Sequence, residues 1–418
     1  FVISLLTFTC GLHAQEIIGF ESRFYLFAQE MYRNGFSWFP TTYDQPYPDY
    51  PGTSTWFIYV AACLFGGLNK FTAVLPTAIA SALTVVITYL IGALHSKRWG
   101  LFAVFFLFLT MTFLKSARSL ALDMYLALIT TWCFYLVHAA DIQRRPQLVR
   151  WIFPLLVLGF AFRGPIGLVM PTGVVCIYYL LNRDIKKFFG IGFVALAILV
   201  GCTFGLLSLA RHVGGESFVQ DVLRMEVVGR IDNSYQPVYF YFVDGLGNYA
   251  LGFPLALLVM VGVFYYISRR DDAVLPDRQF LYSLIGWVFV ILLGMTIPGD
   301  KKIRYVLPMV PGAALLCAYL FVAPPVRQYF ILLRRAVTQL LFLLPIACAL
   351  FAAILYFYAQ KHELVLGVDY QSVVIMMLFL QVALFLLCRR YHHLRQFSDV
   401  SVLLIATISF VAMTIMVL

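Results

Sequence analysis

Long apolar segments recur along the whole chain, and no other feature limits its fold so strongly. Many of these segments approach the roughly 20 residues that a helix needs to cross a hydrocarbon core of about 30 Å. They do not alternate apolar and polar residues, so they do not fit a transmembrane β-barrel. About thirteen segments are apparent, at 1–12, 70–95, 99–114, 119–139, 151–163, 165–182, 187–209, 244–268, 278–297, 303–323, 336–357, 370–388 and 398–418. The sequence therefore predicts an all-α polytopic membrane protein with about thirteen transmembrane helices.

The charged residues indicate how the chain is threaded. Only 12% of the 418 residues are charged, whereas a soluble domain has roughly 25%. With a cytoplasmic amino terminus, every inner loop is basic, so the net charge of +10 reports topology and does not indicate a nucleic-acid partner. We expect one integral domain, 1–418, with a first outer loop at 13–69 that contains interfacial helices. A second large outer loop is expected at 210–243.

The first outer loop predicts an amphipathic helix that turns a carboxylate inward. Phe24, Phe27, Ala28 and Met31 recur at helical spacing, and at 100° per residue Glu21 falls on the side of Phe24 and Ala28. A buried carboxylate is unfavourable unless it has a partner or a chemical role. Glu21 is therefore a candidate catalytic residue. The alternative is that it only favours the amino terminus of the helix.

A stiff segment follows in the same loop, from Tyr47 to Gly52. Pro48 and Pro51 restrict the backbone to extended conformations, so the segment can hold Asp49 in a fixed direction. We therefore take Asp49 as a second candidate catalytic carboxylate. The alternative is a rigid turn that only leads into the next helix.

Basic residues mark the outer ends of three apolar segments, where the positive-inside rule predicts few of them. The free N–H groups and positive dipole end of a helix amino terminus attract anions, and arginine adds bidentate donors. We therefore expect a lipid-phosphate site at these ends, with Arg118, Arg163, Lys302 and Arg304. In Arg163-Gly164-Pro165, proline suits the first helical position. The alternative for each residue alone is an interfacial anchor.

Two further charged residues lie on the expected outer side. Asp123 falls about one turn inside an apolar segment, where an acid is a functional candidate by default. The alternative is a structural ion pair with Arg118 or another outer arginine. Arg230 lies in the second outer loop and is suited to clamp a lipid phosphate or to cover the cavity. The alternative is a solvated charge paired with Glu226 or Asp232.

Other chemistries have no clear motif in this sequence. It contains no P-loop, no GxSxG, no HExxH and no cluster of metal ligands. None of the seven histidines lies at a useful sequence spacing from a carboxylate. We therefore assign no certain cofactor and no metal ligand, although the acidic residues are compatible with a divalent metal ion.

Taken in order, these motifs resemble the GT-C glycosyltransferases of the aminoarabinose transferase and protein O-mannosyltransferase type. Each motif is short, but their joint order covers nearly the whole chain. They are Glu21-Ser22-Arg23-Phe24, Tyr47-Pro48-Asp49-Tyr50-Pro51, Leu122-Asp123, Arg163-Gly164-Pro165, the loop around Arg230, and Lys302-Ile303-Arg304-Tyr305. The resemblance implies a GT-C-like bundle and a transferase that takes a hexosyl or pentosyl group from a polyprenyl phosphate, with inversion at the anomeric carbon.

The resemblance also implies roles for single residues. Glu21 occupies the acidic motif of the first outer loop, and Arg163 matches the basic residue of a motif that holds the donor phosphate. Arg230 matches a phosphate-contacting arginine, Tyr305 a tyrosine near the same site, and Asp123 an acidic position in the fourth span.

Two positions depart from the family pattern. Phe20 stands where the family often has aspartate, which leaves Glu21, alone or with Asp49, as the catalytic acid. Tyr50 stands where the lipid A-modifying members have lysine.

The resemblance implies a multi-pass protein of the bacterial inner membrane whose active site faces the periplasm. Its partners would be an undecaprenyl- or other polyprenyl-phosphate-linked sugar, an acceptor that is a lipid A-like envelope lipid or a protein, and membrane lipids. Two alternatives stay open, a transporter or flippase for a lipid-linked or anionic solute and a lipid-linked polysaccharide ligase.

Overall fold

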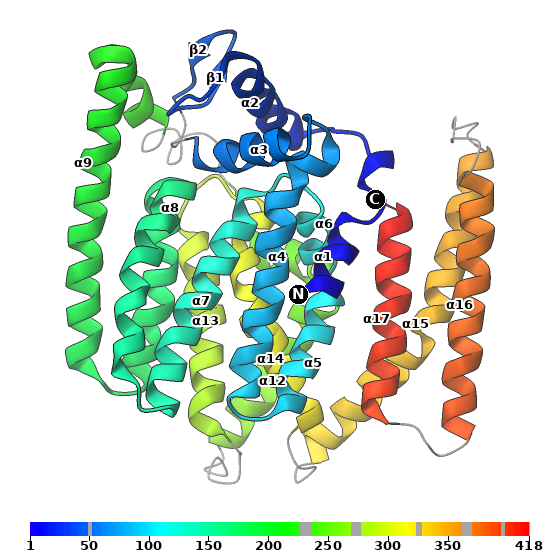
Figure 1. Ribbon diagram of the computed structural model, residues 1–418. Helices are drawn as coiled ribbons and strands as arrows, with labels where there is room; N and C mark the ends of the chain where they lie inside the picture. The colour runs from blue at the N-terminus through cyan, green and yellow to red at the C-terminus, as the bar shows by residue number, and fades with distance from the viewer. Residues whose placement is uncertain are drawn as a thin grey trace.

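The protein is helical almost throughout the part that the structure describes (Figure 1). The computed structural model describes residues 1–48, 52–225, 236–268, 277–322, 328–361, 370–393 and 398–417. Two short antiparallel strands, β1 (Thr41–Thr42) and β2 (Gln45–Pro46), form a hairpin in which Thr41 pairs with Pro46 and Thr42 with Gln45. The prediction of an all-α membrane protein is confirmed.

The helices follow the predicted apolar segments in order. They are α1 (Val2–Thr9), η1 (Leu12–Ala14), α2 (Phe20–Asn34), α3 (Thr53–Leu64), α4 (Lys70–Ala93), α5 (Lys97–Phe108), α6 (Met111–Ala117), α7 (Leu122–Ile142), η2 (Pro146–Trp151), α8 (Ile152–Leu181), α9 (Ile185–Leu223), α11 (Phe240–Asn248), α12 (Gly252–Ser268), α13 (Arg278–Thr296), η5 (Ile303–Met309), α14 (Val310–Val322), α15 (Gln328–Lys361), α16 (Tyr370–His393) and α17 (Asp399–Val417). The η elements are short 3-10 helices.

Nine helical segments in the described ranges are long and apolar enough to cross a membrane, or up to eleven if two bent pairs each form one span. These pairs are α5 with α6, bent by 78°, and α11 with α12, bent by 118°. The predicted count of about thirteen is larger for two reasons. The first segment forms only the eight residues of α1, and the predicted segments 151–163 and 165–182 are counted together as α8, although they form its two legs.

The chain reverses direction inside α8, at Arg163 and Gly164. Both residues leave the helical conformation, and Gly164 adopts φ 59° and ψ −149°, which favours glycine. The reversal brings Gly159 and Gly167 together, because a Cβ added at Gly167 would lie 2.0 Å from the Gly159 carbonyl oxygen. Residues eight apart in a straight helix would be about 12 Å apart. α8 is therefore a hairpin of two legs, with the turn where the two predicted segments meet at 163–165.

The bundle has a buried centre and two lipid-suited flanks. α14 packs against α5, α12 and α13, and 89% of its apolar window together with η5 is buried. α9 stands on one flank, while α15, α16 and α17 form the other (Figure 1). Only 17% of the apolar window of α9 is buried, so its exposed side chains suit contact with lipid.

Helices α2 and α3 lie across one end of the bundle (Figure 1). α2 buries Phe24, Phe27, Ala28 and Met31 together with Glu21, so the predicted inward face is confirmed. This amphipathic pattern stabilises α2 against the bundle, because the apolar side chains leave water at one surface of the helix. The end covered by α2 and α3 is called the capped end below.

The second predicted outer loop is partly helical. α9 continues through its first part to Leu223, with a break at Gly215, where φ is 73°. Gly215 allows this break because glycine adopts a positive φ without steric cost. Phe39 of the first loop packs edge-to-face on Phe218, with ring centroids 5.1 Å apart, so the two loops are in contact.

Candidate active site

Asp123 joins two arginines at the capped end of the bundle. It lies in the first turn of α7, and its Oδ1 is 3.0 Å from Nη1 of Arg163 at the α8 turn. Its Oδ2 is 3.1 Å from Nε of Arg304 in η5, without the alignment of a hydrogen bond. Asp123 and Arg163 are both buried. Asp123 therefore pairs with Arg163 and Arg304 and not with Arg118.

Tyr305 gathers the basic side chains around its ring. The ring centroid is 4.8 Å from the guanidinium carbon of Arg163, 5.8 Å from that of Arg304 and 5.8 Å from Nζ of Lys302. The Tyr305 hydroxyl donates to Asp300 at 3.3 Å, and Lys302 pairs with the same carboxylate at 3.4 Å. The structure therefore brings together four of the predicted phosphate-site residues.

The cluster keeps more positive than negative charge. Its three cations face two carboxylates, Asp123 and Asp300. Lys301 adds a further buried ammonium group, which donates to the backbone carbonyl of Gln236 at 2.9 Å. Within the described residues, this surplus suits an anionic group such as a phosphate.

An apolar groove leads away from Arg163. The cavity has a volume of about 460 Å³ and lies between the second leg of α8 and the end of α13. Apart from Arg163, its lining is apolar: Pro165, Ile166, Val169, Met170, Gly173, Val290, Ile291, Gly294, Met295, Ile297 and Pro298. One buried arginine therefore contacts both the charged cluster and a groove that suits an aliphatic chain.

The amino-terminal end of α2 lies beside this cluster. The Arg304 guanidinium stacks over the Phe20 ring, 4.3 Å from its centroid. Glu21 forms a buried ion pair with Lys70 at the start of α4, and Lys70 also donates to the Glu16 carbonyl at 3.3 Å. Glu21 therefore has the partner that a buried carboxylate requires.

Lys70 was not among the predicted site residues. Its position in the sequence could have marked it as a candidate, because it stands at the expected outer end of the segment 70–95, where the positive-inside rule predicts few lysines. Its partner lies 49 residues away, and sequence spacing does not reveal such a pair.

Arg118 holds a different part of the molecule. It is buried and donates from Nη1 to the carbonyls of Thr7 at 2.9 Å and Phe8 at 3.4 Å, at the end of α1. A cation suits the negative end of a helix dipole. Burial lowers the pKa of this guanidinium below its ordinary value. In the described residues its Nε and Nη2 have no hydrogen-bond partner.

Two predicted site residues, Asp49 and Arg230, lie outside the described residues. Among the residues that are described, there is no group of three or more His, Cys, Asp or Glu side chains that could hold a metal ion.

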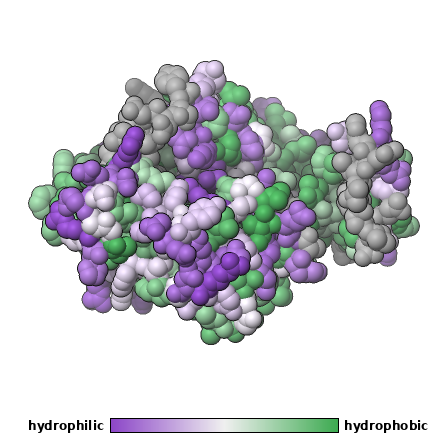
Figure 2. Space-filling view, turned by 90° about the horizontal axis from the view of Figure 1, so that it is seen from above, coloured by the Kyte–Doolittle hydropathy of each residue, from purple (hydrophilic) through white to green (hydrophobic). Residues whose placement is uncertain are grey.

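Viewed from above, polar side chains gather over the central part of the capped end, with apolar patches beside them (Figure 2).

The fold places the chain in a class of membrane proteins with solved structures. This chain superposes on the crystal structure of ArnT from Cupriavidus metallidurans bound to undecaprenyl phosphate with a TM-score of 0.71 at 17% identity. The superposition covers 99% of this chain and 76% of the ArnT chain. The apo structure of the same protein gives a TM-score of 0.70. The GT-C fold predicted from the resemblance is therefore confirmed.

Sequence comparison adds named relatives. Residues 49–205 match the family model described as dolichyl-phosphate-mannose-protein mannosyltransferase. An undecaprenyl phosphate-alpha-4-amino-4-deoxy-L-arabinose arabinosyl transferase of Sodalis glossinidius is 28% identical over 72% of this chain and 54% of the relative. An uncharacterized protein of Aquifex aeolicus is 25% identical over 64% of this chain and 52% of the relative. The chain spans about half the length of these relatives, and the resemblance to the aminoarabinose transferase and protein O-mannosyltransferase type is confirmed.

Proposed function

We propose that this multi-pass membrane protein is a glycosyltransferase that moves a sugar from a polyprenyl-phosphate donor to an acceptor at the capped end of the bundle. One observation carries the proposal: Arg163 contacts both the basic cluster and the apolar groove. A lipid phosphate has these two parts, a charged headgroup and an aliphatic chain. The names of the ArnT and mannosyltransferase relatives support a donor of this chemistry.

In the proposed reaction, an acceptor oxygen attacks the anomeric carbon of the sugar, and the bond to the phosphate oxygen breaks with inversion. The electron pair of that bond stays with the polyprenyl phosphate, which leaves with added negative charge. The buried Arg163, the half-buried Arg304 and the exposed Lys302 stabilise this charge. Asp123 holds the two guanidinium groups in place, so they need not reorganise during the reaction.

Glu21 is our candidate for orienting the acceptor and, where the acceptor is a hydroxyl, for accepting its proton. Its ion pair with Lys70 keeps the carboxylate fixed at the start of α2, next to the residue that stacks on Arg304. Asp49 is the second candidate for this role, as the resemblance implies. A substrate that enters the site would have to share or displace Lys70 before Glu21 accepts a proton.

We further propose the bacterial inner membrane as the location, with the capped end facing the periplasm. The basic loops at the opposite end support this orientation. For the acceptor, an envelope lipid related to lipid A and a protein are both consistent with the names of the relatives. A transporter or flippase and a polysaccharide ligase are less favoured, because ArnT structures match 99% of the chain.

Binding of undecaprenyl phosphate to the purified protein tests the donor site. We expect native mass spectrometry of the protein in detergent to show one bound lipid phosphate, and Arg163→Ala to weaken its binding about tenfold or more through loss of a charged hydrogen bond. Arg211→Ala is the matched control, because Arg211 is exposed and pairs with Glu216. Equal binding by wild type and Arg163→Ala would contradict the proposed phosphate site.

A further inference from the structure

A second polar cluster lies at the end of the bundle opposite the capped end. His95 follows α4, His138 is near the end of α7, Tyr178 is near the end of α8, and Asp277 precedes α13. Sequence spacing gave no indication of a histidine paired with a carboxylate, but the structure contains one. His95 and Asp277 are 182 residues apart in the chain but only 3.0 Å apart in space.

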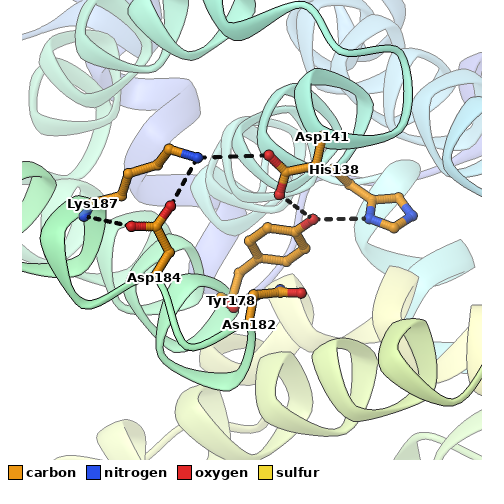
Figure 3. Close-up of polar contacts among 6 residues, drawn as sticks. All are labelled: His138, Asp141, Tyr178, Asn182, Asp184 and Lys187. Carbon is orange, nitrogen blue, oxygen red and sulfur yellow. Dashed lines mark hydrogen bonds and ion pairs between the residues drawn. The ribbon is translucent and has the colours of Figure 1, made fainter.

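These residues form one continuous line of hydrogen bonds. His95 Nδ1 lies 3.0 Å from Asp277 Oδ1, and His95 Nε2 lies 2.9 Å from His138 Nε2. On the other side, His138 Nδ1 lies 3.3 Å from the Tyr178 hydroxyl, which donates to Asp141 Oδ2 at 2.9 Å. Figure 3 shows the half of this line that runs from His138 to Asp141.

The line fixes how many protons the two rings must hold. With the Tyr178 hydroxyl donating to Asp141, the contact between His138 and Tyr178 is a hydrogen bond only in the tautomer whose Nδ1 carries a proton and donates to the Tyr178 oxygen. A carboxylate only accepts, so His95 Nδ1 must also carry a proton and donate to Asp277. A third proton must lie between the two Nε2 atoms. Two neutral imidazoles hold only two protons, so the complete line requires one extra proton and one positive charge.

The aromatic surroundings suit this charge. Phe280 stacks against both imidazoles, with ring centroids 4.1 Å from His95 and 4.6 Å from His138. The face of an aromatic ring attracts a cation. The two imidazole planes differ by only 18°, so they lie nearly parallel beside the phenyl face. His138 also stacks on Phe134, at 5.7 Å.

Other charged groups lie near Asp141, at one end of the line. Asp141 lies 3.9 Å from Lys187, which pairs with Asp184 at 2.9 Å (Figure 3). The hydrogen bonds from Lys187 lower the pKa of the Asp184 carboxyl. A cavity of about 420 Å³ is lined by both histidines, Asp141, Asp277 and Arg278, and it gives water and protons access to the line.

We propose that His95 and His138 share one proton and form a pH-sensitive clamp across α4, α7, α8 and α13. Loss of the shared proton at high pH breaks one hydrogen bond of the line. A second extra proton at low pH places two like charges on rings whose nitrogens are 2.9 Å apart. All the hydrogen bonds of the clamp therefore form only in the pH range between loss of the shared proton and binding of the second extra proton. Three of the clamped helices, α7, α8 and α13, also supply Asp123, Arg163 and the groove lining of the capped end.

The direct test counts the ring protons. In protein labelled with ¹⁵N-histidine and reconstituted in lipid nanodiscs, NMR at neutral pH should show three protonated ring nitrogens for the pair. The His95→Gln and His138→Gln variants identify the signals of the pair. A count of two protonated nitrogens at every pH in the range of about 5 to 8, where histidine charge ordinarily changes, would overturn the proposal.

The second test measures thermal stability against pH, and it does not depend on any glycosyltransferase activity. We expect the Tm of the wild type to reach a maximum between pH 5 and pH 9 and to fall by about 2 °C or more on both sides. Tyr178→Phe removes the hydroxyl that His138 donates to and keeps the ring, so this curve should be flatter. His212→Gln, at an exposed position, should follow the wild type. Parallel curves for wild type and Tyr178→Phe would overturn the proposal.

Discussion

The two polar clusters lie on the same helices and differ in what their charges face. At the capped end, α7 and α8 supply Asp123 and Arg163, and the basic side chains there outnumber the acidic ones. At the opposite end, the same helices supply His138 and Tyr178, and each polar group in the line contacts another. A cluster with a net positive charge favours binding of an anionic ligand, whereas a line of hydrogen bonds between helices holds those helices together.

The cavities beside the two clusters also differ, in the polarity of their linings. The capped end opens into an apolar groove that starts at Arg163, and the opposite end opens into a cavity lined by carboxylates, imidazoles and amides. Buried charge on its own therefore does not identify an active site in this bundle. The distinguishing features are unbalanced charge and an adjoining surface that fits the rest of the substrate.

The largest effect should follow from Arg163→Ala. We expect the release of polyprenyl phosphate from its sugar donor to slow by about 100- to 1000-fold, as for loss of one preorganised charge-stabilising donor in other enzymes. A Michaelis–Menten comparison in nanodiscs measures it. Arg163→Lys should keep part of the rate because it retains the charge but loses the bidentate geometry. A rate within threefold of wild type in Arg163→Ala would contradict the proposal that the capped end, unlike the opposite end, binds the donor phosphate.

A smaller loss should follow from Asp123→Asn, about 10- to 100-fold in the same assay, because this residue acts through the arginines and does not contact the donor in our proposal. The variant also leaves the buried guanidinium of Arg163 and the half-buried guanidinium of Arg304 without their carboxylate, so its Tm should fall. Rates are therefore compared below the Tm of the variant. A loss as large as that of Arg163→Ala would place Asp123 itself among the groups that contact substrate.

Gly173→Leu tests the groove separately from the charge. A Cβ at Gly173 would already lie 3.2 Å from Val290 Cγ1, so a leucine should narrow the groove. We expect the KM for a full-length polyprenyl donor to rise about tenfold, equivalent to roughly two buried methylene groups, with kcat nearly unchanged. A short-chain donor should be unaffected. Gly190→Leu on α9, where the added Cβ has nothing within 4 Å, is the control.

The smallest effect at neutral pH should come from His138→Gln. It interrupts the line at the opposite end without touching the basic cluster, so we expect donor release at pH 7 to stay within about threefold of wild type, a difference below 1 kcal/mol. The measurement is the same turnover assay repeated at several pH values. A loss comparable to that of Asp123→Asn would mean that the two ends do not act separately.

Residues close in sequence were predicted well. The turn at Arg163-Gly164-Pro165 follows from local backbone preferences, and the inward direction of Glu21 follows from helical spacing. Both depend on contacts within a few residues, where the geometry of a helix fixes which side chains share a face. A short apolar helix, α3, is likewise present where the sequence predicted one in the first loop.

Partners far apart in sequence could not be assigned in this way. Asp123 pairs with Arg304 across 181 positions, while the nearer Arg118 caps α1. His95 reaches Asp277 only because α4 ends, and α13 begins, at the same side of the bundle. Such pairs depend on how helices pack in three dimensions, and a single sequence gives the spans without their order around the bundle.

The α8 hairpin also has a consequence for how the chain enters the membrane. The 3-10 helix η2 runs directly into its first leg, and η2 and both legs form one apolar helical stretch from Pro146 to Leu181. The apex of the hairpin carries a charged guanidinium, and the legs touch at Gly159 and Gly167. We therefore expect the two legs to insert as one preassembled unit during synthesis. Arg163 would then reach the far side of the membrane already positioned, and a side chain at either glycine would disturb biogenesis before it disturbed turnover.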